Sequence, residues 1–178
     1  MLNYDSLESM IDFILRTYHP NLRGELDRVI EESESLKDQY QEQFPELQQV
    51  CELLRQFRSE VWPHIDREEQ EFFPVLREIE QTALGLREFH DCDLERFDAV
   101  IKKMELEHEH FDTYVYDFVK VFERHSPLKQ ENPHIHEYFL STYTKLESET
   151  RHHTSLENTK LHSLARDLFL QVCHLKNT

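Results

Sequence analysis

Residues 47–79 read LQQVCELLRQFRSEVWPHIDREEQEFFPVLREI and show the clearest helical pattern of the chain. Its apolar side chains recur from Leu47 to Ile79 at alternating steps of three and four residues, which places them on one face of an α-helix. His64 and Glu68 stand four residues apart in line with the same face. A polar side chain among core side chains must find a partner or cost stability. The stretch therefore predicts a long amphipathic helix with a buried polar site.

Three further segments show the helical period, and each carries a histidine in line with its apolar side chains. The four histidines are spaced by 45, 44 and 45 residues: His19, His64, His108 and His153. Four helices folded up-down-up-down return to the same height once per helix, so equal spacing brings one residue of each helix into one layer. Two of the histidines have a glutamate four residues later on the same face, Glu68 and Glu157. We therefore predict a shell of four imidazoles and two carboxylates for two transition-metal ions.

Composition agrees with an all-α class. The 178 residues include only 2 glycines and 6 prolines, and 31 % are charged. This length suits one domain with a real core, so we expect residues 1–178 to form a single up-down-up-down four-helix bundle with a short leading N-terminal helix over about 6–16. The long helices are expected over about 18–41, from Pro45, over about 91–124 and after Pro133, with Leu164 and Leu168 on the buried face of the last.

Charge and hydropathy exclude several classes of function. The net charge of −16, with no basic run, argues against nucleic acid as a partner. No apolar stretch approaches the roughly 20 residues of a spanning helix, so no membrane partner is expected. The N-terminus resembles no signal peptide, and we expect a cytoplasmic protein. The three cysteines, Cys51, Cys92 and Cys173, form no C-x-x-C pair and are interpreted as reduced thiols.

Helical phase separates the candidate ligands from the rest of the 12 histidines. His110 is about 200° around the helix from His108 and so faces away from the apolar stripe. His152 is one step out of phase with its own stripe. The others are expected near helix ends, in loops or far from the layer, and they are not interpreted as ligands: His90, His125, His134, His136, His162 and His174.

Two other kinds of metal site fit the sequence less well. Ferritin-like di-iron bundles use Glu-x-x-His on alternate helices, and the sequence contains this spacing at Glu105 to His108 and at Glu149 to His152. These pairs fall on consecutive helices, and the second needs the out-of-phase His152. Structural zinc favours four closed ligands, often cysteine. Imidazole with carboxylate suits iron or manganese, so iron is expected, with manganese or zinc as substitutes.

The order His, His-x-x-x-Glu, His, His-x-x-x-Glu resembles the hemerythrin-like HHE cation-binding family over about residues 18–170. Within it, EEQEFFP at 68–74, MELEH at 104–108 and HTSLEN at 153–158 are similar to the di-iron proteins that repair iron–sulfur clusters after nitric oxide or peroxide stress. The resemblance implies an oxo-bridged di-iron centre. It makes the four histidines terminal ligands, and it makes Glu68 and Glu157 bridging ligands.

Two departures from the family shape the functional expectation. Oxygen-carrying hemerythrins have one more histidine on the third helix, where this sequence has Met104 and Asp112. The repair proteins carry a cysteine-bearing N-terminal domain, whereas this sequence starts at the bundle. Three hypotheses remain open: a di-iron protein of nitrosative or oxidative stress defence, a non-enzymatic sensor or store of O2 or NO, and a bundle with a structural metal. The expected partners are O2, NO or peroxide, and an iron–sulfur apo-protein for the repair activity.

Overall fold

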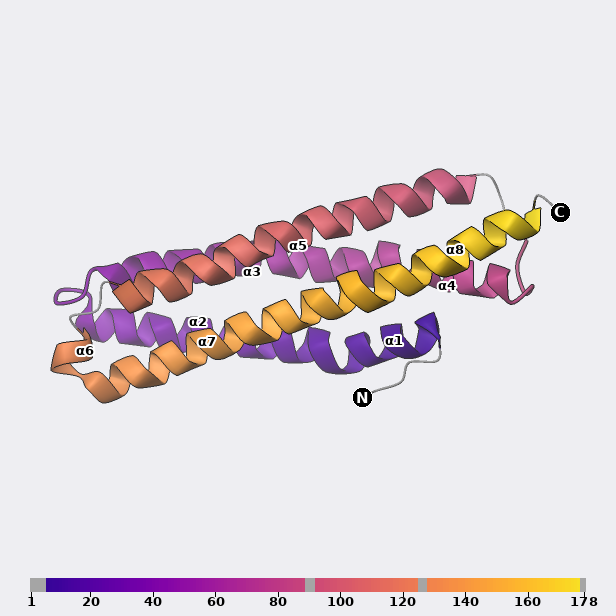
Figure 1. Ribbon diagram of the computed structural model, residues 1–178. Coiled ribbons are helices and arrows are strands. Elements are labelled where there is room, and N and C mark those ends of the chain that lie inside the picture. Colours follow the sequence, from indigo (N-terminus) through magenta and orange to yellow (C-terminus); the bar gives the residue numbers. More distant parts are fainter. Residues whose placement is uncertain (1–5, 89–91, 125–127, 177–178) are drawn as a thin grey trace. The chain divides into compact units, whose positions relative to one another are not determined.

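The computed structural model describes residues 6–88, 92–124 and 128–176, and within them every regular element is helical and none is a strand (Figure 1). The first half of the chain contains α1 (Leu7–Phe13), η1 (Ile14–Tyr18), α2 (His19–Tyr40), α3 (Glu46–Arg67), η2 (Glu68–Phe72) and α4 (Phe73–Ala83). The second half contains α5 (Cys92–Arg124), α6 (Leu128–Glu131), α7 (Pro133–Leu156), η3 (Glu157–Leu161) and α8 (His162–Lys176). The η segments are π-helical. The prediction of an all-α fold is confirmed.

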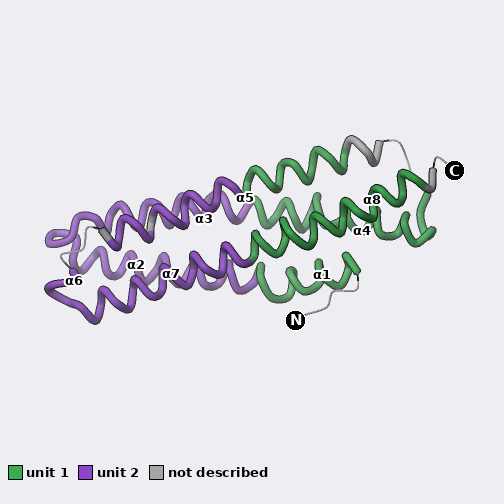
Figure 2. The backbone as a smooth tube through the Cα atoms, in the orientation of Figure 1, with its two compact units in different colours: residues 1–19, 64–108, 153–178 green, residues 20–63, 109–152 purple. Residues whose placement is uncertain are grey.

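The chain forms two compact units (Figure 2). Unit 1 comprises residues 1–19, 64–108 and 153–178, and unit 2 comprises residues 20–63 and 109–152. The long helices α3, α5 and α7 each contribute one part to either unit. In each unit four helical segments, far apart in the sequence, pack as a bundle. The expectation of a single domain over residues 1–178 stays a prediction.

Unit 1 is built around an apolar core formed by residues of α1, η1, η2, α4, α5, α7, η3 and α8. Phe97 of α5 and Phe169 of α8 stack with ring centroids 4.2 Å apart. The core also contains Leu7, Ile11, Ile14, Phe72, Phe73, Leu76, Leu161 and Ala165, all at 0 % exposure. Ser6 caps α1 in a capping box with Ser9, which fixes where this helix begins. The core therefore holds four helix segments in register around the polar residues described below.

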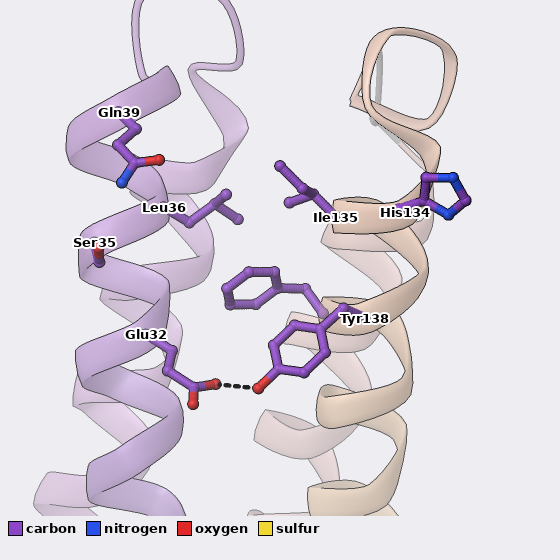
Figure 3. Close-up of a pocket in the computed structure, with 8 residues that line it drawn as sticks. Glu32, Ser35, Leu36, Gln39, His134, Ile135 and Tyr138 are labelled. Carbon is purple, nitrogen blue, oxygen red and sulfur yellow. Dashed lines mark hydrogen bonds between the residues drawn. The ribbon is translucent and has the colours of Figure 1, made fainter.

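Unit 2 has its own core and an open cavity at one place on its surface. Tyr143 and Ser33 are buried and joined by a hydrogen bond of 2.8 Å between their hydroxyl oxygens. A cavity of about 420 Å³ opens between α2 and α7, where the Tyr138 hydroxyl donates to Glu32 at 3.1 Å (Figure 3). Side chains that line it include Leu36 and several other apolar groups. In neither unit does a helix of the described residues have an apolar run long enough to cross a membrane.

The junction before His19 differs from the prediction. The leading helix does not end before the first long helix begins, because the π-helical segment η1 joins α1 to α2 without a break. In η1 the His19 amide donates to the carbonyl of Ile14, five residues earlier. Pro20 then lies in the second position of α2. A proline ring clashes with the carbonyl four residues before it, and the wider π turn gives that carbonyl room.

The buried face of the last helix is also shifted from the prediction. Leu164 and Leu168 were expected in the core, but both are only partly buried, whereas Ala165 and Phe169 are buried. The shift is one residue. It arises at η3, because a π turn holds about one residue more than an α turn and so advances every later side chain around the axis.

Candidate metal centre

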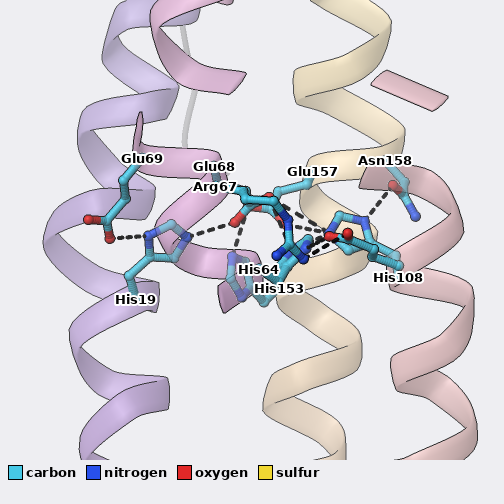
Figure 4. A network of polar contacts seen from close by, with 10 residues as sticks. His19, His64, Arg67, Glu68, Glu69, His108, His153, Glu157 and Asn158 are labelled. Atoms are coloured by element: carbon cyan, nitrogen blue, oxygen red, sulfur yellow. Dashed lines mark hydrogen bonds and ion pairs between the residues drawn. The ribbon is translucent and has the colours of Figure 1, made fainter. Parts of the chain in front are cut away.

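The structure brings all six predicted residues together in unit 1 (Figure 4). Each is at most 3 % exposed: His19, His64, Glu68, His108, His153 and Glu157. The histidines come from α2, α3, α5 and α7, and the glutamates open η2 and η3. The histidines are spaced by about 45 residues and lie on the buried faces of their helices, and they converge in one layer as expected. The ligand atoms form one buried polar cluster inside an apolar core.

The cluster divides into two groups of four ligand atoms that share both glutamates. One group is His19, Glu68, His153 and Glu157, and the other is His64, Glu68, His108 and Glu157. Within each group the candidate ligand atoms all lie within 4.8 Å of one another. Each group has two imidazole nitrogens and two carboxylate oxygens, a donor set that suits iron or manganese. The arrangement is that of two neighbouring cation sites.

The two carboxylates connect the groups atom by atom. Glu68 places Oε2 at 3.1 Å from His19 Nε2 and Oε1 at 3.4 Å from His64 Nε2. Glu157 places Oε1 at 2.9 Å from His153 Nε2 and Oε2 at 3.3 Å from His108 Nε2. Each carboxylate therefore presents one oxygen to either group, which is the geometry of a carboxylate that bridges two ions.

Three of the four histidines are oriented by an acceptor on the far side of the ring. Nδ1 of His19 donates to Glu69 at 2.9 Å, and Nδ1 of His64 donates to Glu107 at 2.7 Å. Nδ1 of His108 donates to the amide oxygen of Asn158 at 2.8 Å. A hydrogen bond of this kind fixes the tautomer and leaves Nε2 with a lone pair. These three rings therefore present Nε2 to the cluster.

Several buried polar atoms of the cluster make no hydrogen bond. They are His19 Nε2, both carboxylate oxygens of Glu68 and Glu157 Oε2. Nε2 of His64 and Nε2 of His108 face each other at 3.1 Å, so two lone pairs meet unless a proton or a cation lies beside them. Buried polar atoms without partners are rare, and a cluster of them indicates a bound ion or water that satisfies them. The residues therefore fit a pair of metal ions.

The electrostatics of the cluster favour positive charge at its centre. Burial by itself lowers the pKa of His64, but the charge of Glu68 and the hydrogen bond to Glu107 raise it to about 10. Burial raises the pKa of Glu68, yet the surrounding imidazoles hold that pKa well below its ordinary value. Two carboxylates inside an apolar core thus stay ionised only with compensating positive charge. Metal cations supply that charge, and protons on the imidazoles supply it without them.

The sequence itself identifies the protein family to which this site belongs. The sequence matches the family model of the hemerythrin HHE cation-binding domain over residues 10–165, which is most of the chain. The chain belongs to the hemerythrin HHE cation-binding family. No significant match to a curated protein or to a solved structure was found. The resemblance inferred from the spacing of the six residues is therefore confirmed.

Each of the three π turns found among the described residues of this HHE domain lies at a candidate ligand. η1 ends at the residue before His19, while η2 and η3 begin at Glu68 and Glu157. Across the last two, the amides of Phe73 and His162 donate to the carbonyls of these glutamates, five residues earlier. Single π turns in α-helices are rare and occur frequently at functional sites. Here they set the height and rotation of three of the six side chains.

Aromatic rings close the cluster of the HHE domain against water. Phe73 stacks on His19 with ring centroids 5.7 Å apart, and Tyr18 stacks on His153 at 5.0 Å with the planes 4° apart. Burial, together with the charge of Glu157, raises the pKa of the Tyr18 hydroxyl above its ordinary value. Tyr18 is therefore a neutral phenol beside the cluster, a contact that the sequence pattern did not single out.

The exposed histidines agree with the phase argument. His110 and His152 are exposed, as are His134 and His174, whereas the candidate ligand His108 is buried. His136 is buried in unit 2 and stacks on Phe122 with ring centroids 5.1 Å apart. The ferritin-like alternative loses its second pair, because Glu149 is exposed as well as His152. His90 and His125 lie outside the described residues, and so does the side chain of Cys92.

His162 contradicts the prediction that it lies far from the layer. Its side chain is fully buried, and its ring is nearly parallel to that of His108, with centroids 6.0 Å apart. The reason is η3, because a π turn places residue 162 rather than 161 above Glu157. Burial, with the charge of His108, lowers the pKa of His162 to about 4 although the charge of Glu157 opposes the shift, so the ring is neutral.

Proposed function

We propose that this HHE domain binds two iron ions through the six residues and uses them to bind O2, NO or peroxide in defence against nitrosative or oxidative stress. The observation that carries the proposal is that two buried groups of two histidines share both glutamates. If the two groups shared only one carboxylate, a single metal ion beside a histidine–glutamate ion pair would explain the arrangement equally well. Two shared carboxylates, each with one oxygen facing either group, support a binuclear site.

Iron is the metal that best combines the donor set with this chemistry. Mixed imidazole and carboxylate ligands suit iron and manganese, and no cysteine takes part in either group. Zinc accepts the same ligands but has no redox chemistry. Four protein ligands for each ion leave coordination positions for small molecules. Two iron ions would supply those positions and one-electron redox chemistry, a property that zinc in the same site would lack.

Neighbouring side chains orient the imidazoles of the site and cover one side of it. Nδ1 hydrogen bonds to Glu69, Glu107 and Asn158 hold three imidazoles in place, which lowers the cost of ordering them when metal binds. The rings of Tyr18 and Phe73 cover the His19 and His153 side. The burial of the cluster favours small diatomic molecules over larger substrates. Delivery of iron to an apo iron–sulfur protein, the repair activity, would require the site to release its metal.

Metal analysis followed by anaerobic ligand titration tests the proposal. The purified protein is loaded with iron, its iron content is measured, and the reduced form is titrated with NO and separately with O2 while absorption is recorded. Two iron ions per chain and a spectral change with NO are expected. One ion per chain, or no response to either gas, would contradict the proposal. A repeatable cycle of oxygenation and deoxygenation would instead indicate a sensor or store, and iron transfer to an apo iron–sulfur protein would indicate repair.

A further inference from the structure

His162 is a buried histidine whose ring nitrogens have no hydrogen-bond partner among the described residues. Its exposure is 0 %, and neither Nδ1 nor Nε2 makes a hydrogen bond. A neutral imidazole carries one N–H donor and one lone pair. A buried donor without an acceptor is rare, because burial removes it from water and gives nothing back. The position therefore calls for a partner that the protein does not supply.

Glu105 lies close to His162, and its carboxylate is already engaged. Oε1 of Glu105 lies 3.6 Å from Nδ1, which is longer than an N–H···O hydrogen bond. The same oxygen accepts from Nη2 of Arg166 at 2.7 Å. Its ring neighbours are His108 at 6.0 Å and Phe72 at 5.1 Å between centroids, and the charges of Glu157 and Glu68 act on it without a hydrogen bond to either nitrogen. None of these satisfies the donor.

His162 also makes the two halves of the cluster different. Beside His19 and His153 lie the rings of Phe73 and Tyr18, and both stack on the histidines they cover. Beside His108, in the other group, lies the polar ring of His162. A small ligand next to His108 would therefore meet an N–H group, whereas one next to His19 would meet an aromatic face.

We propose that His162 is a positioning residue that donates a hydrogen bond to a small exogenous ligand bound at the metal position held by His64 and His108. This inference rests on the proposed function, because it needs an ion in that position. Azide, NO and O2 all present hydrogen-bond acceptors. The ligand supplies the acceptor that His162 lacks, and His162 selects the His64 and His108 side over the side covered by Tyr18.

Azide binding to the oxidised, iron-loaded protein tests the inference. Three variants are compared with the wild type: His162→Phe keeps a flat ring without a donor, His162→Gln keeps an N–H donor, and Glu105→Ala removes the nearest carboxylate. Azide affinity is measured by absorption titration, and the azide vibrations are recorded by resonance Raman spectroscopy in H2O and D2O. Iron content is measured for every sample.

The expected result is a selective loss in the Phe variant. Its azide dissociation constant should rise about 10-fold, as for one lost hydrogen bond to a charged ligand. His162→Gln should recover most of the affinity, and Glu105→Ala should bind azide like the wild type. The azide vibrations should shift in D2O in the wild type and the Gln variant but not in the Phe variant. A role in packing alone would produce no such isotope shift.

Failure of this inference and failure of the proposed function give different results. A wild-type protein without two iron ions, or without azide binding, contradicts the proposed function itself. Two iron ions and normal azide binding, with no D2O shift in the wild type, would overturn the role of His162 alone. That measurement needs no variant, so it stands even if His162→Phe folds poorly. Equal azide affinity in the Phe variant and the wild type would overturn it as well.

Discussion

Glu107 offers the sharpest test of how the cluster is held together. Its Oε2 accepts from Nδ1 of His64 at 2.7 Å, and its Oε1 accepts from Arg67 at 2.7 Å. The side chain is 23 % exposed. Burial raises its pKa, but the hydrogen bonds to His64 and Arg67 lower it to about 2, so it is an anion at neutral pH. Glu107→Ala would leave the His64 ring without its orienting acceptor while all six candidate ligands remain.

The expected cost follows from the charge and length of this hydrogen bond. Loss of an outer partner of a metal-binding histidine commonly lowers metal affinity about 10–100-fold, which is about 1.4–2.7 kcal/mol. A short hydrogen bond to an anion is roughly twice as strong as one between neutral groups. Glu107→Ala should therefore fall near the upper end of this range. Asn158→Ala, which removes a neutral amide from His108 at 2.8 Å, should fall near the lower end.

Metal affinity is measured by competition with a chelator of known affinity, using iron under anaerobic conditions. Glu109→Ala is the matched control, because Glu109 is an exposed acid on the same helix and its removal changes the net charge equally. Circular dichroism confirms that each variant is folded. Equal losses for Glu107→Ala and Glu109→Ala would refute the reasoning, since the effect would then be one of overall charge. A greater loss for Asn158→Ala would refute the ranking by charge.

Three further outcomes are expected. His108→Ala should lose at least half of the bound iron in elemental analysis, whereas His110→Ala, whose side chain is exposed, should keep the wild-type content; equal contents would show the phase assignment to be wrong. In metal-free protein, folding raises the pKa of His64 from 6.5 to about 10, so the folded state binds more protons over this window and thermal stability should fall as pH rises through it. Iron-loaded protein should show a weaker fall, and equal slopes in the two melts would count against the site. Burial raises the pKa of the Cys51 thiol to about 11, so iodoacetamide should label Cys51 only after unfolding; rapid labelling of folded protein at pH 8, located by mass spectrometry, would contradict its burial.

The periodicity of the sequence was sufficient to predict the helices and the convergence of the six residues. Alternating steps of three and four residues determine which face of a helix is buried, and His64 and Glu68 lie on that face in both the pattern and the structure. Equal spacing of the histidines then determines their common layer, because helix rise is nearly constant. These are properties of one helix at a time, so a single sequence is enough to infer them.

The outer partners could not be found in the same way. Glu69 and Glu107 lie one residue away from positions that face the core, and each looks like an ordinary surface acid in a chain with 36 acidic residues. Their role depends on the neighbouring helix, since Glu69 contacts His19 and Glu107 contacts His64. Asn158 reaches His108 across helices in the same manner. Contacts between helices depend on rotation and tilt, which the period of a single helix does not determine.

The π turns account for the errors in phase, and the sequence carries a partial signal for them. Pro20 and Pro74 each lie two residues after the end of a π segment, at Tyr18 and Phe72. The sequence predicts a helix start at about residue 18, just before Pro20, yet a proline fits equally well after a widened turn that frees the carbonyl it would clash with. No proline follows η3 to indicate its π turn. A strictly α-helical period therefore misplaces the residues after it, and it does not predict that His162, five residues after Glu157, lies beside the cluster. Because the turns that shift the phase begin at Glu68 and Glu157, the site itself is where a strictly α-helical period fails, and a phase slip beside a candidate ligand is evidence for a binding site rather than against it.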